Sequence, residues 1–111
     1  MKNKQVVITL LGSAGGVAKS VLSLLNQTAI DVNAPLNHLI TNSTIHLIDL
    51  QQKKLEYYIT LFPHLRNNLV LHELDLKKIE KLMHHLQKTK TDVVIDVSWA
   101  DTVKMLECCN H

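Results

Sequence analysis

Short apolar runs alternate with amphipathic segments along the chain. The runs are rich in Leu, Ile and Val, which is typical of buried strands, and they cover residues 6–11, 44–49, 68–74 and 92–97. Apolar residues recur at helical spacing in four other segments, residues 16–27, 52–62, 76–88 and 100–110. We expect Asp75 to cap the third helix, and residues 28–43 to form an unusually long loop.

This alternation of strands and helices predicts the fold class. Four strand–helix units in strict succession indicate a parallel sheet with right-handed crossovers. We therefore expect an α/β, Rossmann-like three-layer sandwich with strand order 3-2-1-4. With 111 residues, 46% of them hydrophobic, the chain forms one domain over residues 1–111.

Charge and cysteine content narrow the possible partners and location. Twelve basic and ten acidic residues give a net charge of only +2, which argues against nucleic-acid binding. The apolar run at residues 6–11 is far too short to span a membrane. Cys108 and Cys109 are adjacent and form no metal-binding or redox spacing, so we expect a reduced, cytoplasmic protein.

A glycine-rich segment joins the first strand to the first helix. It contains Gly12, Gly15 and Gly16 and ends at Ala18, with the spacing G-x-x-G-x-x-A. In an open parallel sheet this position suits a pyrophosphate, because glycines let it approach the backbone and the helix N-terminus attracts its charge. The segment therefore predicts a dinucleotide site.

Asp49 closes the second strand, where a carboxylate can accept hydrogen bonds from ribose hydroxyls. This acid would repel a 2′-phosphate, so the sequence favours NAD over NADP. Lys53 and Lys54 follow closely and leave NADP open. Capping of the following helix is an equally good interpretation of Asp49.

A second interpretation concerns the same glycines. The segment from Gly15 to Ser20 is similar to the deviant phosphate-binding loop of partitioning-type ATPases, with Lys19 as the phosphate ligand. Ala18 departs from that pattern, because its side chain stands where the loop needs glycine. Ala14 also replaces the lysine that deviant loops carry there.

Taken together, residues 11–18, 48–50 and 92–99 resemble the N-terminal cofactor domain of the saccharopine dehydrogenase and homospermidine synthase superfamily. The resemblance spans nearly the whole chain. It assigns the pyrophosphate to the loop and the ribose to the end of the second strand. It also assigns the adenine to the end of the third strand and the nicotinamide side to the end of the fourth. The implied cofactor-binding residues are Gly12, Ser13, Ala14, Gly15, Gly16, Val17, Asp49, Leu50, Asp75, Leu76, Val97 and Ser98.

Members of that superfamily continue into a separate catalytic and dimerisation domain. We therefore expect this chain to be a truncated module that holds NAD(P) for hydride transfer to or from an amine or amino-acid substrate. The substrate would be bound by the missing domain, and the resemblance allows a homodimer of the full-length protein. No acid–base set converges in the sequence, so we expect no catalytic residue and no activity in isolation.

Seven histidines are the remaining candidate ligands. His84 and His85 are adjacent on a predicted helix and therefore point roughly 100° apart. The others show no spacing that a helix or hairpin would bring together. The sequence alone thus predicts no metal site.

Overall fold

The structure, a computed structural model, describes residues 5–97. Its strands are all parallel and form one sheet in the order β3-β2-β1-β4, with the bounds β1 (Val7–Leu11), β2 (Thr44–Asp49), β3 (Leu69–Glu73) and β4 (Val93–Asp96). The predicted fold class and strand order are therefore confirmed. The predicted helix at residues 100–110 lies outside the described residues.

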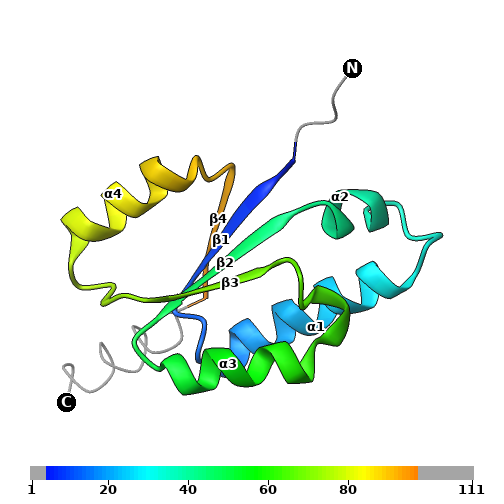
Figure 1. Cartoon of the computed structure of the whole chain (residues 1–111), viewed down its shortest axis with the longest axis horizontal. Coiled ribbons are helices and arrows are strands. Elements are labelled where there is room, and N and C mark those ends of the chain that lie inside the picture. The colour runs from blue at the N-terminus through cyan, green and yellow to red at the C-terminus, as the bar shows by residue number, and fades with distance from the viewer. Residues whose placement is uncertain (1–4, 98–111) are drawn as a thin grey trace, which may run out of the picture.

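Helices cover both faces of the sheet (Figure 1). α1 (Gly16–Ile30) and α3 (Gln52–Leu61) lie together on one face, and α4 (Ile79–Thr89) lies on the other. The chain changes face between β3 and β4, so β1 and β4 flank the point where the strand order reverses. Ligands of open α/β sheets bind at that point, outside the carboxyl ends of the strands.

The face beneath α1 and α3 carries the core. Every second strand residue points to this side. The residues that do so are Ile8, Leu10, Ile45, Leu47, Leu69 and Leu71. Ala18 and Leu22 of α1 and Leu55 of α3 are fully buried against them. This apolar layer fixes the carboxyl ends of the strands relative to α1.

The face beneath α4 is more polar and less covered. The sheet register places Thr9, His46 and Val70 side by side on it, and Ile48 next to His72. No residue of α4 is buried, and Ile79 and Met83 are 68% and 51% exposed. The apolar stripe predicted for this helix is therefore only half covered in the described part of the chain.

Two local predictions were wrong. The expected loop at residues 28–43 contains the last turn of α1 and a further short helix, α2 (Asn37–Thr41). The side-chain Nδ2 group of Asn37 donates to the carbonyls of Thr28 and Ala29, which caps the end of α1 and fixes the path to α2. Ile40 is buried and anchors α2 to the core.

Asp75 does not cap α4, which begins at Ile79 and has Lys78 at its cap position. Instead, Oδ1 of Asp75 accepts the Lys77 N–H at 2.9 Å, and its carbonyl accepts the Lys78 N–H at 3.0 Å. Asp side chains favour such local turns, which compete with helix formation. The turn delays the helix by three residues relative to the prediction.

Among the described helices, none has the length and apolar character needed to cross a membrane.

Candidate functional site

The inner half of the glycine loop is locked to the neighbouring strand. Gly12 has a φ of 77°, which glycine adopts without strain, and its N–H donates to the Ile48 carbonyl at 3.0 Å. The Ser13 hydroxyl is fully buried, donates to the Leu10 carbonyl at 2.7 Å and accepts the Ile48 N–H at 3.2 Å. Ser13, a predicted cofactor contact, therefore holds the loop on β2 with its side chain instead of facing a ligand.

The outer half of the loop, from Ala14 to Val17, is accessible. A methyl group on Gly16 would meet no atom within 4 Å, and one on Gly15 would lie 3.9 Å from the Gly12 carbonyl oxygen. Packing within the protein therefore does not require glycine at either position. The space in front of both residues is open, as a pyrophosphate approaching the first amides of α1 would need.

Asp49 connects this outer half to β2. Its Oδ2 atom accepts the Ala14 N–H and its Oδ1 atom accepts the Gln51 N–H, both at 3.1 Å. The cap position of α3 is Gln51, so Asp49 does not serve as the helix cap. Each carboxylate oxygen can accept a further hydrogen bond, so a ribose hydroxyl is still a possible partner.

Tyr58 supports the loop from α3. Its hydroxyl donates to the Gly15 carbonyl at 3.4 Å, and its ring is buried against Phe62. Burial, and then the negative charge of Asp49, raise the pKa of the Tyr58 hydroxyl. Tyr58 therefore stays protonated as a donor to the loop, a role that the sequence pattern did not indicate.

Two cavities flank the loop and Asp49. One of about 350 Å³ is lined at the ends of β2 and β3 by Asp49, Leu50, Gln51, Leu74, Asp75, Leu76 and Lys77. It brings together all four residues that the sequence assigned to the adenine and ribose. The other, of about 360 Å³, is lined by Ala14, Lys19, Lys53, Lys54, Tyr57 and Tyr58.

The predicted nicotinamide end is described only in part. The Val97 N–H donates to the Leu11 carbonyl at 3.0 Å, which places the end of β4 beside the glycine loop. Val97 is only 4% exposed, packs in the core and has its N–H bonded to Leu11, so it offers little surface to a ligand. Ser98 lies outside the described residues, as do Trp99, Cys108 and Cys109.

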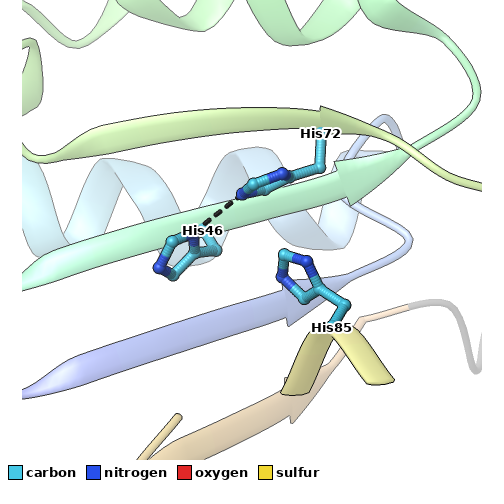
Figure 2. Close-up of side chains that lie close together, drawn as sticks. All are labelled: His46, His72 and His85. Carbon is cyan, nitrogen blue, oxygen red and sulfur yellow. Dashed lines mark hydrogen bonds between the residues drawn. The ribbon is translucent and has the colours of Figure 1, made fainter. Parts of the chain in front are cut away.

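Three histidines meet on the α4 face of the sheet (Figure 2). His46 of β2 and His72 of β3 are joined by a 2.8 Å hydrogen bond between Nδ1 and Nε2, and His85 reaches toward both from α4. The centroid of the His85 ring lies 4.3 Å from that of His72 and 5.6 Å from that of His46. One nitrogen from each ring lies within 4.8 Å of the other two.

The environment keeps these rings neutral. Burial, followed by the charges of His85 and His46, lowers the pKa of His72 from 6.5 to about 4. Burial also lowers the pKa of His46 and of His85, assisted by His85 in the first case and by Lys88 in the second. Each imidazole therefore carries one lone pair at neutral pH, as metal binding requires.

Short ligand spacings in the sequence do not indicate this cluster. His46 and His72 are 26 positions apart and become neighbours only through the register of β2 and β3. Strand alternation gave a usable signal, since Ile45 and Leu47, like Leu69 and Leu71, point to the other face. Both histidines are therefore assigned by parity to one face of adjacent strands.

Comparison with known proteins adds no assignment: no family model and no curated protein matches the chain. The saccharopine dehydrogenase resemblance therefore stays a prediction from the residues that carry it.

Proposed function

We propose that the chain binds an NAD-type dinucleotide at the carboxyl edge of its sheet, as the cofactor module of an oxidoreductase of the saccharopine dehydrogenase type. The observation that carries the proposal is the common cavity of Asp49, Leu50, Asp75 and Leu76, directly beside the glycine loop. The cavity is formed by the ends of β2 and β3, and the hydrogen bond from the Ala14 N–H to Asp49 joins it to the glycine loop.

Within this proposal, the pyrophosphate lies over Gly15 and Gly16, whose missing side chains leave open space before α1. The adenosine half follows the cavity along β2 and β3, with its ribose at Asp49. A 2′-phosphate would meet the Asp49 carboxylate, so NAD is the preferred cofactor. By the same resemblance, a further domain would supply the substrate-binding groups.

Alanine substitutions at the open glycines test this proposal. The added methyl groups of Gly15→Ala and Gly16→Ala fit the unliganded protein. Gly16→Ala should therefore change the free energy of unfolding little, whereas Gly15→Ala, at the N-cap of α1, should lower it by no more than about 1 kcal/mol. Both methyl groups would occupy the place of the pyrophosphate and should weaken NADH binding about tenfold or more. Calorimetric titration with NADH and NADPH measures this effect, with the exposed α1 variant Ser23→Ala as the matched control.

Unchanged NADH affinity in both glycine variants, or no NADH binding by the parent chain, would refute the proposal. Gly12→Ala is a contrasting variant, because its φ of 77° disfavours a side chain. It should destabilise the fold by about 1–2 kcal/mol, which is more than either of the other two variants should.

The cavity beside Ala14 supports a second candidate, the binding of nucleoside triphosphates. Lys19, Lys53 and Lys54 all line it and could neutralise phosphate charge. Against this candidate, Ala18 stands where the phosphate-binding loop needs glycine, and the Ala14 N–H already donates to Asp49. A phosphate cradle would use such amides. Titration of the parent chain with Mg-ATP beside NADH distinguishes the two candidates.

A further inference from the structure

We infer that His46, His72 and His85 form a binding site for a divalent transition-metal ion such as Zn²⁺, on the sheet face beneath α4. The inference is independent of the proposed nucleotide site, which is built from the strand ends, the glycine loop and α3.

The geometry needs little adjustment to hold such an ion. Two imidazole nitrogens bound to Zn²⁺ at about 2.0–2.1 Å in a tetrahedral site lie about 3.3 Å apart. His46 Nδ1 and His72 Nε2 are already 2.8 Å apart, and all three ligand atoms lie within 4.8 Å of one another. The three ligands come from β2, β3 and α4. Small side-chain rotations would bring their nitrogens to metal-binding distance.

The hydrogen bonding of the cluster also favours a metal ion. In the bond between His46 and His72, one ring nitrogen donates the proton that the other accepts. When a metal replaces this bond, the donor ring carries its proton on the other nitrogen, and both lone pairs face the ion with no net proton loss. His85 Nε2 is buried without a hydrogen-bond partner among the described residues. In the tautomer that carries no proton on Nε2, a metal ion would supply the partner that this lone pair lacks.

Access to the ion comes through an adjoining cavity of about 380 Å³. Its lining includes His72, His85, Glu73, Lys81 and Lys88. Three protein ligands leave a fourth tetrahedral position for water or another small ligand. The two lysines favour an anion there, which would offset the added positive charge. Imidazole ligands suit Zn²⁺, Cu²⁺, Ni²⁺ and Fe²⁺, whereas Mg²⁺ and Ca²⁺ require oxygen ligands.

The test titrates Zn²⁺ into the full chain against a chromophoric chelator, in a Cys108→Ser/Cys109→Ser background that removes thiol binding. His72→Asn and His85→Asn should each weaken Zn²⁺ binding at least about 100-fold, because loss of mere supporting groups already costs 10–100-fold. The exposed His64→Asn variant is the matched control and should leave the affinity unchanged. Co²⁺ in place of Zn²⁺ should show the strong visible absorption of a four-coordinate site, and Mg²⁺ should not compete.

Equal Zn²⁺ affinity in His72→Asn, His85→Asn and His64→Asn would overturn the inference, as would the absence of binding to the parent. A measurement on the unsubstituted histidines covers the case in which the variants fail to fold. One equivalent of Zn²⁺ should shift the imidazole NMR signals of His46, His72 and His85 together, and leave those of His38 and His64 in place. Shifts confined to His38 and His64, or no shifts, would refute the site.

Discussion

The two faces of the sheet differ in how they are covered. Beneath α1 and α3, the strands present leucine and isoleucine to helices whose inner residues are fully buried. Beneath α4, the same strands present Thr9, His46 and His72, and Val70 and Val94 remain 39% and 48% exposed. One face is a dry core, and the other is a partly open surface with polar groups in its centre.

This difference indicates that one face mainly stabilises the fold and the other carries chemically active groups. The apolar face supplies most of the stabilisation, because hydrophobic stabilisation grows with the apolar area removed from water. The polar face contributes less of that stabilisation, so polar side chains that can bind ligands are tolerated there at a smaller cost. Its histidines make hydrogen bonds and ring contacts that an apolar core would not need. Substitutions on the two faces should accordingly have unequal effects.

The largest difference should come from matched leucines on the two helical layers. Leu55→Ala in α3 removes a fully buried side chain and should lower the free energy of unfolding by about 2–5 kcal/mol. Leu82→Ala in α4 removes a half-buried one and should cost only about 1 kcal/mol. Urea unfolding of both variants measures the difference. Equal losses would mean that both faces are packed alike.

The second prediction concerns the buried link between the apolar core and the glycine loop. Ser13→Ala leaves the Ile48 N–H without its side-chain acceptor and should lower the free energy of unfolding by about 1–3 kcal/mol. The exposed Ser23→Ala variant should change it very little. The same urea experiment decides this, and an unaffected Ser13→Ala protein would show that the loop is held by its backbone alone.

The sequence predicted the strands and their order but not the contacts on the polar face, for a physical reason. Short apolar runs such as residues 44–49 and 68–74 are typical of buried strands. The strand order followed from the strict alternation of strands and helices. Contacts between His46 and His72 depend on the register of two strands, which no local pattern specifies.

The candidate nucleotide site was predictable in part. Asp49, Leu50, Asp75 and Leu76 line one cavity because parallel strands end at the same edge. The hydrogen bonds that these residues make within the protein were not predictable. Asp75 forms a turn instead of a helix cap, because its side chain finds a nearer N–H. In the same way, the contact of Tyr58 with Gly15 depends on the packing of α3 against α1.

Acid should lower the free energy of unfolding through the histidines of the polar face. The pKa of His72 is lowered to about 4, whereas an unfolded histidine titrates near 6.5. Between these values the unfolded chain binds the proton and the folded chain resists it, so stability is full above about pH 6.5 and falls toward pH 4. The titratable and charged groups around His72 are His46 on β2, His85 and Lys88 on α4, and Glu73, Lys81 and His84 at the same cavity.

The urea midpoint between about pH 7 and pH 5 measures this effect, above the range in which most carboxylates titrate. His72→Asn should flatten the decline, and the exposed His64→Asn should not. Because the rings are only partly buried, the decline should be smaller than the loss in Leu55→Ala. A midpoint that stays constant over this range would show that the cluster is as well solvated as free histidine.

The smallest expected effect distinguishes the two nucleotide interpretations at the loop. Lys19 is exposed and lines the cavity that it shares with Lys53 and Lys54, beside the loop instead of over Gly15 and Gly16. In the dinucleotide proposal it contributes only a screened surface charge, so Lys19→Ala should change NADH affinity by less than about 1 kcal/mol. In the triphosphate interpretation the same lysine would contact the phosphates directly, and its loss should nearly abolish Mg-ATP binding. Asp49→Ala should affect NADH binding, which Lys19→Ala should leave nearly unchanged, because it removes both the ribose acceptor and the partner of the Ala14 N–H. It should weaken NADH binding and reduce any discrimination against NADPH. If Lys19→Ala abolished Mg-ATP binding and Asp49→Ala left NADH unaffected, the lysine-lined cavity would be the nucleotide site.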